Sequence, residues 1–155
     1  MFDPVVARIT PPARGLDFGC GPGPVLAEVF TQAGYTMAVY DLYFAKHDDV
    51  IDSEQMAGQY DFITATEVAE HLGEPGAVLR HLFALLRPGG VLGVMTKLVK
   101  DQESFKTWHY IRDRTHISFF SLATFEWFAG QTGGQVEFVG ADVVLLRKPL
   151  RGEAF

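Results

Sequence analysis

The sequence predicts an α/β fold: a doubly wound, mostly parallel sheet that ends in an antiparallel hairpin. Short apolar segments of strand length alternate with segments of helical periodicity, and this alternation implies a parallel sheet covered by helices on both faces. The last two apolar segments are separated by a short turn at Gly140-Ala141, which is typical of a hairpin. A length of 155 residues fits one domain covering residues 1–155.

The N-terminal half is predicted to contribute two strands and one helix. Residues 1–13 contain three prolines and are expected to form a lead-in without regular structure. The elements that follow are expected to be a strand over 14–18, a helix over 25–33 and a strand over 35–40. The apolar face of that helix is expected to consist of Val25, Leu26, Val29 and Phe30, with Gly34 as the helix-ending glycine.

The segment from Asp41 to Gln59 is only weakly patterned. It has room for one or two helical turns and for at most the stub of a third strand. We therefore expect the sheet to lack a full strand between the one that ends at Asp41 and the one that begins near Asp61.

The C-terminal half carries clearer patterns. The predicted elements are a strand over 61–65, a helical start over 66–72, a helix over 75–86, a strand over 91–96, a helix from Ser121 or Thr124 to about 131, and hairpin strands over 135–139 and 143–147. The run Arg87–Gly90 is expected to stop the helix before it. Residues 98–117 form a polar and aromatic connection whose length indicates a functional role.

The topology would bring chemically useful residues to one edge of the sheet. Right-handed crossovers place the strand-to-helix turns of a parallel sheet at its carboxyl edge, where ligands bind. Asp17–Gly23, Asp41, Thr66–His71 and the chain from Lys97 onward all belong to that edge.

Composition and charge disfavour several classes of protein. A net charge of −6 argues against a dedicated nucleic-acid binder. No apolar stretch approaches the roughly 20 residues needed to cross a bilayer, so no membrane partner is expected. The single cysteine, Cys20, rules out an internal disulfide framework, and the start of the chain lacks a signal-peptide pattern. These features predict a cytoplasmic location.

The stretch Leu16–Pro24 predicts a glycine turn that binds a nucleotide-like ligand. Its glycines allow a close backbone approach, and the helix behind the turn offers N–H groups to anionic ligand atoms. The spacing Gly-x-Gly-x-Gly differs from the Gly-x-Gly-x-x-Gly pattern of dinucleotide-binding folds, which disfavours a nicotinamide-dependent dehydrogenase. Asp41, at the end of the next strand, can accept hydrogen bonds from ribose hydroxyls, a feature common to adenosine cofactors.

Taken in sequential order, four motifs resemble those of class I S-adenosylmethionine-dependent methyltransferases. They are Leu16–Pro24, Tyr40-Asp41, Tyr60–Leu72 and Leu85–Thr96. The run Leu-Leu-Arg-Pro-Gly-Gly-Val-Leu at 85–92 is similar to the segment before that family's fifth strand. The resemblance implies a Rossmann-like fold, S-adenosylmethionine as cofactor and methyltransferase activity. Compared with the family, the N-terminal helices and the third strand are expected to be reduced or missing.

The resemblance also implies a set of cofactor-binding residues: Asp17, Gly19, Cys20, Gly21, Gly23, Asp41, Leu42 and Thr66. The glycine turn would wrap the methionine part of the cofactor, and Asp17 would help to place its ammonium group. Asp41 would bind both ribose hydroxyls, Leu42 would flank the adenine, and Thr66 would contact the methionine end. Each residue also has a purely structural interpretation, as a turn glycine, a cap or a solvated carboxylate.

The segment Glu67-Val68-Ala69-Glu70-His71 predicts a site for acceptor chemistry. Methyl transfer needs a nucleophile that loses its proton to a base or beside a metal. If a helix begins near Glu67, then Glu67, Glu70 and His71 share one face. The alternative is that the two glutamates only favour a helix N-terminus.

The pattern Glu-x-x-Glu-His is similar to that of ubiquinone-biosynthesis O-methyltransferases and small-RNA 2′-O-methyltransferases, in which it is associated with a divalent metal and a later histidine. The resemblance implies Glu67, Glu70, His71 and His116 as ligands of Mg²⁺ or Zn²⁺, with His109 in reserve. His71 and His116 are the implied catalytic residues.

Two functions are open on the sequence alone. The first is methyl transfer to a small-molecule acceptor, at an oxygen atom. The alternative is a cofactor-binding module without independent activity, which needs a partner or a second copy to supply a lid. Trp108 and Tyr110 are candidates for an acceptor pocket, whereas Phe119 and Phe120 are expected in the core.

Overall fold

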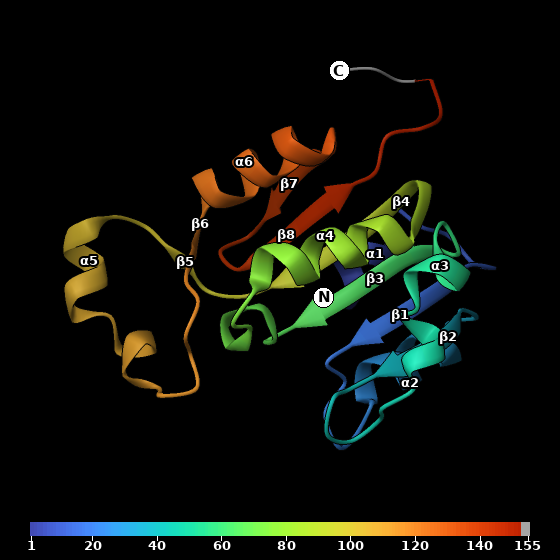
Figure 1. Ribbon diagram of the computed structural model, residues 1–155, viewed down its shortest axis with the longest axis horizontal. Helices are drawn as coiled ribbons and strands as arrows, with labels where there is room; N and C mark the ends of the chain where they lie inside the picture. Colours follow the sequence, from blue (N-terminus) through green and yellow to red (C-terminus); the bar gives the residue numbers. More distant parts are fainter. Residues whose placement is uncertain (153–155) are drawn as a thin grey trace.

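The structure is a computed structural model that describes residues 1–152, apart from the side chain of Ser53. Its main feature is a six-stranded sheet with the strand order β2-β1-β3-β4-β8-β7 (Figure 1). The strands are β1 (Arg14–Phe18), β2 (Thr36–Tyr40), β3 (Tyr60–Thr66), β4 (Leu86–Met95), β7 (Gln135–Val139) and β8 (Val143–Arg147). The first four run parallel and β8 pairs antiparallel with β4 and β7, which confirms the predicted sheet and hairpin.

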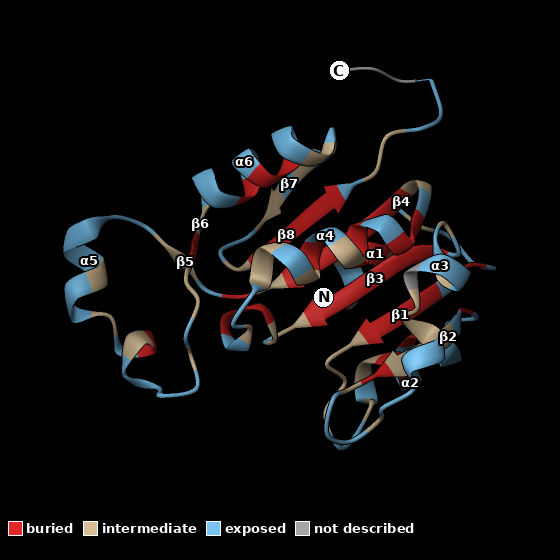
Figure 2. Ribbon diagram, viewed as in Figure 1, coloured by how far each residue is buried: buried red, intermediate tan, exposed pale blue. Residues whose placement is uncertain are grey.

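Helices cover both faces of the sheet. They are α1 (Phe2–Val6), α2 (Val25–Gln32), α3 (Ser53–Met56), α4 (Pro75–Leu85) and α6 (Leu122–Thr132). The larger core joins α4 and α6 to one face, and the smaller core joins α1 and α2 to the other. Along β8, Val144 and Leu146 belong to the larger core while Val143 and Leu145 face the opposite side, as the alternation of a strand requires. Figure 2 shows the buried central strands.

The N-terminal residues are more regular than predicted. Instead of an unstructured lead-in they form α1, because Val5 is fully buried against Phe30 and Phe62. Pro4 lies in the first turn of this helix, where a missing N–H breaks no hydrogen bond.

The buried face of α2 differs from the predicted one. Ala27 and Phe30 are buried, whereas Val25 is 65% exposed and Val29 is 38% exposed. The small Ala27 side chain lets the helix approach the sheet, so the prediction was right for Phe30 and wrong for the two valines. The predicted end of the helix holds, since Gly34 adopts a φ of +92°.

Within the described part of the chain, residues 41–59 form no sheet strand. They contain an isolated bridge between Asp41 and Ala45, the short helix η1 (Asp48–Val50) and α3. The Tyr60 hydroxyl donates to the carbonyl oxygen of Val50 at 2.8 Å, which holds this segment against the sheet. The expected lack of a full third strand is therefore confirmed for these residues.

The strand β4 begins earlier than predicted. Leu86 already pairs with Tyr60, and the register shifts before Phe62 pairs with Val91. Gly89 adopts a φ of +82°, which allows the chain to turn at this irregularity. The helix α4 ends at Leu85, before this turn.

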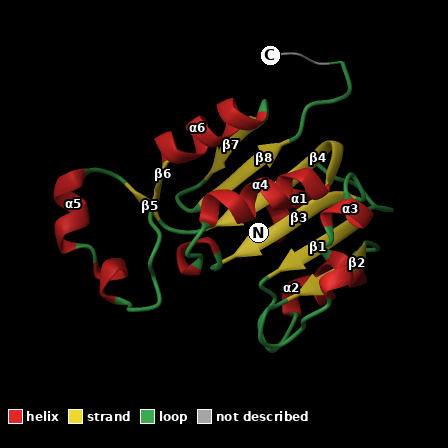
Figure 3. Cartoon of the chain, in the orientation of Figure 1, coloured by secondary structure: helices red, strands yellow, loops and turns green. Residues whose placement is uncertain are grey.

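Residues 98–119 leave the sheet as an excursion (Figure 3). Its ends lie side by side because β5 (Leu98–Val99) pairs with β6 (Phe120–Ser121). It contains the helix α5 (Gln102–Thr107) and the short helix η3 (His109–Arg112), neither of which was predicted. A capping box between Asp101 and Ser104 starts α5. None of the described helices has the length and apolar character needed to cross a membrane.

Candidate functional site

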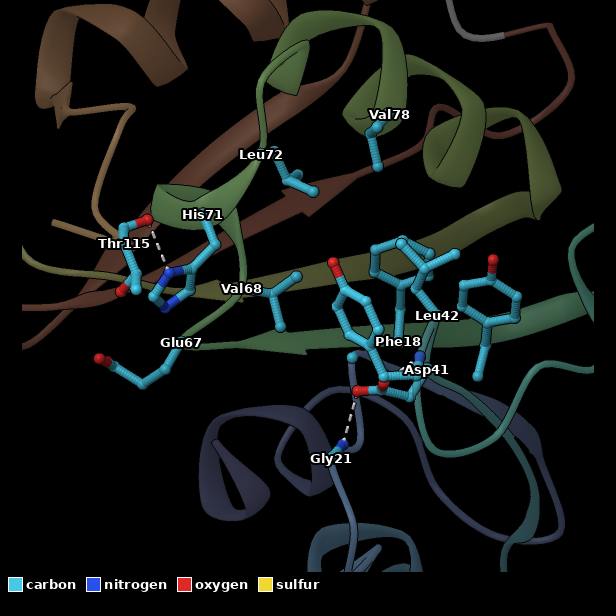
Figure 4. A pocket seen from close by; sticks show the side chains of 13 residues that line it. Phe18, Gly21, Asp41, Leu42, Glu67, Val68, His71, Leu72, Val78 and Thr115 are labelled. Carbon is cyan, nitrogen blue, oxygen red and sulfur yellow. Dashed lines mark hydrogen bonds between the residues drawn. The ribbon is translucent and has the colours of Figure 1, made fainter.

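A cavity of about 750 Å³ opens at the carboxyl edge of β1, β2 and β3 (Figure 4). Asp41 and Gly21 lie at one end of it, and His71 and Glu67 lie at the other. The residues that line it are Phe18, Gly19, Gly21, Tyr40, Asp41, Leu42, Tyr43, Glu67, Val68, His71, Leu72, Val78 and Thr115. The topology predicted a ligand site at this edge, and four of the predicted cofactor-binding residues are among its walls.

The glycine turn is tied to the end of β2. The N–H groups of Gly19 and Cys20 donate to the carbonyl oxygen of Tyr40 at 2.7 and 3.2 Å. Gly19 has a φ of +76°, and a Cβ atom there would lie 2.3 Å from Cγ2 of Val68, so only glycine fits. Cβ atoms at Gly21 and Gly23 would meet open space, which leaves their backbone accessible to a ligand.

Asp41 is fixed by three backbone N–H groups. Oδ2 accepts from Gly21 at 2.9 Å, and Oδ1 accepts from Tyr43 at 2.9 Å and from Phe44 at 3.1 Å. Partial burial opposes ionisation, but these three donors outweigh it and hold the pKa of Asp41 below its usual range. A carboxylate oxygen can accept two hydrogen bonds, so Oδ2 retains room for a ligand hydroxyl.

Two predicted cofactor residues lie deeper. Asp17 is 4% exposed, and its Oδ1 accepts from the Thr64 hydroxyl at 2.8 Å. Burial raises the pKa of Asp17, and the bond from Thr64 partly offsets that rise. The Thr66 hydroxyl is buried without a hydrogen-bond partner among the described residues. An orphaned hydroxyl at this edge fits a role in contacting a ligand.

Three side chains converge beside the other end of the cavity, and of these His71 lines it. Glu70, His71 and His116 each offer one ligand atom, and these atoms lie within 4.8 Å of one another. Glu70 is fully buried; its Oε1 accepts from the Tyr110 hydroxyl, and its Oε2 has no partner in the described structure. An orphaned carboxylate oxygen beside two imidazoles is a donor set that suits a divalent cation.

Both histidines are oriented by backbone carbonyls. His71 Nδ1 lies 2.9 Å from the oxygen of Thr115, and His116 Nδ1 lies 2.9 Å from the oxygen of Tyr110. Because a carbonyl oxygen only accepts, each Nδ1 donates a proton to it, and Nε2 is the ring nitrogen left for a ligand. Ligating histidines are held in this way in metal sites, so the residues present fit a bound cation.

Glu67 does not join this group as predicted. No helix begins at Glu67, because its φ is +53°; a short 3₁₀ turn, η2 (Ala69–His71), follows instead. Glu67, Glu70 and His71 therefore do not share one helix face, contrary to the prediction. Burial, followed by repulsion from Glu70, raises the pKa of Glu67, while Lys97 lowers it in part. His109 also lies outside the group, with its Nε2 3.5 Å from Nζ of Lys97.

Sequence reasoning missed most of the apolar wall of the cavity. Phe18 and Tyr40 stack with their ring centroids 5.3 Å apart, and Val68 lies against the glycine turn. Phe18 and Tyr40 each end a strand, and this position could have identified them in the sequence as residues of the cavity wall. Trp108 and Tyr110 do not line this cavity; Tyr110 is 5% exposed and lies behind Glu70. Phe120 is buried in the core, as expected.

These features define a class of protein. A mostly parallel sheet, a Gly-x-Gly-x-Gly turn after β1 and an acidic residue after β2 are those of a class I S-adenosylmethionine-dependent methyltransferase. The model of a family described as "Methyltransferase domain" matches residues 2–137, and the chain belongs to that family.

Curated relatives share part of the sequence. The chain is 36% identical to a ubiquinone biosynthesis O-methyltransferase of Bordetella avium (strain 197N) over 97 residues, which cover 50% of this chain and 39% of the relative. It is 32% identical to the protein of that name from Xanthomonas campestris pv. campestris (strain B100) over 116 residues, which cover 61% of this chain and 48% of the relative. The chain thus spans less than half the length of these relatives.

Solved structures share the fold. A SAM-dependent methyltransferase from Archaeoglobus fulgidus superposes with a TM-score of 0.74 at 14% identity, covering 95% of this chain and 91% of its own. A 1,6-didemethyltoxoflavin-N1-methyltransferase from Burkholderia thailandensis, solved with its acceptor and S-adenosylhomocysteine, has a TM-score of 0.68 at 15% identity, covering 95% and 76%. At these identities the likeness concerns the fold.

Proposed function

We propose that the protein transfers a methyl group from S-adenosylmethionine to an oxygen atom of a small-molecule acceptor, beside a divalent cation. One observation carries the proposal: a single cavity joins the glycine turn and Asp41 at one end to Glu67 and His71 at the other (Figure 4). Oxygen is proposed as the methylated atom because the curated relatives are named O-methyltransferases.

The proposed cofactor residues are those of the turn and the strand ends. Gly19, Cys20, Gly21 and Gly23 would hold the methionine part with their backbone, and Leu42 would cover the adenine. Asp41 is ionised and pre-oriented to accept from the ribose hydroxyls. Asp17 and Thr66 would contact the methionine end. When bound, the cofactor supplies an electrophilic methyl group, so these residues contribute by positioning it and excluding water.

The proposed cation ligands are Glu70, His71 and His116, with Glu67 beside Glu70. Two imidazole nitrogens with a carboxylate suit Zn²⁺ better than Mg²⁺, which prefers oxygen ligands and waters. A bound cation would lower the pKa of an acceptor hydroxyl. Nε2 of His71 and Nε2 of His116 can alternatively accept the acceptor proton directly, so these two residues are the proposed catalytic groups. Nε2 of His116 lies 3.8 Å from Oδ2 of Asp113.

The proposal extends to partners and location. The net charge of −6 favours a small-molecule acceptor over a nucleic acid. We propose a cytoplasmic protein in which a second copy or a partner chain covers the open cavity. The exposed residues Leu42 and Tyr43 of the cavity lining, followed by the exposed Phe44, support such a cover. Light scattering of the purified chain, alone and with S-adenosylhomocysteine, would test self-association.

Binding of S-adenosylhomocysteine, measured by titration calorimetry, tests the cofactor part. We expect one site per chain and loss of most of the affinity in Asp41→Asn. Asp49→Asn, an exposed aspartate away from the cavity lining, is the matched control. Unchanged binding in Asp41→Asn would contradict the assigned role.

Methyl transfer is tested with labelled S-adenosylmethionine and a panel of phenols, catechols, amines and thiols. Turnover of a hydroxyl compound is the expected result. If the cofactor binds and no acceptor in any class is methylated, the alternative of a module without independent activity gains support.

A further inference from the structure

Tyr110 contacts two of the three converging side chains behind the cavity. Its hydroxyl donates to Oε1 of Glu70, whose Oε2 has no hydrogen-bond partner in the described structure. The Glu67 carboxyl is a second neighbour that interacts with Glu70. Oε1 keeps one acceptor position, whereas Oε2 keeps both and is the oxygen more open to a ligand. The hydroxyl of Tyr110 therefore favours one orientation of the Glu70 carboxylate.

The same residue also fixes His116. Its carbonyl oxygen lies 2.9 Å from His116 Nδ1, and its ring lies 4.0 Å from the His116 ring, centroid to centroid. The first contact sets the tautomer and the second sets the ring orientation. One residue thus orients a carboxylate from η2 and an imidazole from the end of the excursion.

Tyr110 is itself held rigidly. It is 5% exposed, its hydroxyl lies 3.3 Å from Oγ1 of the fully buried Thr96, and Trp108 packs on its ring at a centroid distance of 4.8 Å. Nζ of Lys97 lies 5.5 Å from the centre of the same ring. A buried hydroxyl with a fixed partner on each side has little freedom to point elsewhere.

We propose that Tyr110 is the positioning residue of the cation site, orienting Glu70 through its hydroxyl and His116 through its ring and carbonyl oxygen. This inference rests on the proposed cation site. Tyr110 is not among the residues that line the cavity, so we expect its removal to affect cation binding more than cofactor binding.

Binding of Co²⁺, a spectroscopic substitute for Zn²⁺, tests the role. Tyr110→Phe removes the hydroxyl and keeps the ring, and we expect the Co²⁺ affinity to fall about 10- to 100-fold with a changed visible absorption spectrum. Tyr35→Phe is the matched control, because Tyr35 is also buried and donates to a backbone carbonyl far from the site, that of Ile9 at 2.6 Å. The control should bind Co²⁺ as the unmodified protein does.

A purely structural role predicts a different result. In that case Tyr110→Phe would lower the melting temperature while leaving the Co²⁺ affinity and spectrum unchanged, which would overturn the inference. Thr96→Val supplies a second variant should Tyr110→Phe fold poorly, because it removes the other partner of the Tyr110 hydroxyl; a smaller loss of Co²⁺ affinity is expected, and no loss would overturn the inference.

The cation site and the positioning role can fail separately. If the unmodified protein binds no Co²⁺ or Zn²⁺, both the cation site and the role of Tyr110 are overturned. Calorimetry with S-adenosylhomocysteine then decides whether the cofactor part of the proposed function stands. If the unmodified protein and Tyr110→Phe bind Co²⁺ equally, only the positioning role is overturned.

Discussion

The two ends of the cavity are built in different ways. At the cofactor end, the important groups are backbone atoms: the N–H of Gly21 bonds to Asp41, and the turn at Gly19 bonds to the end of β2. At the cation end, the important groups are side chains that converge from η2 and from the far end of the excursion.

The two ends therefore differ in how far apart in the sequence their contacting residues lie. The cofactor end depends on glycine conformations and strand ends that lie within one stretch of chain and its neighbour. The proposed cation end depends on Tyr110, Thr115 and His116, which contact Glu70 or His71 across 40 or more positions of the chain. We therefore expect damage at the cofactor end to affect folding, and damage at the cation end to remove one ligand without affecting the other.

The largest effect is expected at Gly19. Gly19→Ala would force a side chain into a φ of +76° and place its Cβ 2.3 Å from Val68. Backbone strain and overpacking each cost about 1–3 kcal/mol of folding free energy. Urea unfolding measures the change, and Gly23→Ala, whose Cβ meets open space, should change stability by less than about 0.5 kcal/mol. Equal stabilities for the two variants would remove the distinction between the ends.

The next effect concerns the cation. Glu70→Gln should lower the affinity for Zn²⁺ at least about 100-fold, because it replaces the one carboxylate of the set by a neutral amide. Binding of S-adenosylhomocysteine should be unchanged. Elemental analysis and calorimetry measure the two properties, with the exposed Glu74→Gln as control. A parallel loss of both ligands would show that the two ends are not independent.

A substitution at Asp41 should weaken cofactor binding and leave Zn²⁺ binding intact, the reverse of the effect at Glu70, and the loss of affinity should be smaller. Asp41→Asn leaves a single neutral acceptor for three backbone donors, and hydrogen bonds to charged groups contribute about 1.5–3 kcal/mol each. Cofactor affinity should therefore fall about 10- to 150-fold while Zn²⁺ binding persists. Retained cofactor affinity with lost Zn²⁺ would reverse the assignment of the two ends.

The smallest effect is expected from the pH dependence at Asp17. Its pKa is raised in the folded state, so the folded chain holds this proton more tightly and stability falls as pH rises from the unfolded pKa through the folded pKa. Asp17→Asn should remove this contribution and be no less stable than the unmodified protein at pH 7, while binding S-adenosylhomocysteine more weakly. Urea unfolding of both proteins at pH 4 and pH 7 measures this contribution to the free energy of unfolding. If Asp17→Asn is less stable than the unmodified protein at pH 7, Thr64 stabilises the ionised form of Asp17.

Much of the fold follows from local patterns, and the exceptions have physical reasons. Strands β1, β2, β7 and β8 match their apolar runs, and Ser121 caps α6 as expected. The pattern did not reveal α1, which depends on burial of Val5 by distant residues. The start of α5 could have been recognised in the sequence, because Asp101 and Ser104 have the spacing of a capping box.

The site divides in the same way. The glycine turn and the position of Asp41 at the cavity could be predicted because they depend on short-range geometry. The cation end could be predicted only as a set of residue types, and the helix expected at Glu67 was wrong because a left-handed φ at a glutamate has no sequence signal. Tyr110 could not be placed, because its position depends on how the excursion returns to the sheet.

The pairing of β5 with β6 has a consequence for redesign. Since Leu98 and Phe120 lie side by side, the excursion leaves and re-enters the sheet at one point, and its tip can change length at a loop-closure cost of only about 0.6 kcal/mol per doubling. The α5 turn, Gln102–Thr107, lies between that base and Tyr110. It is a natural position for an exchangeable segment whose length and sequence could be changed while the sheet and Tyr110 stay in place.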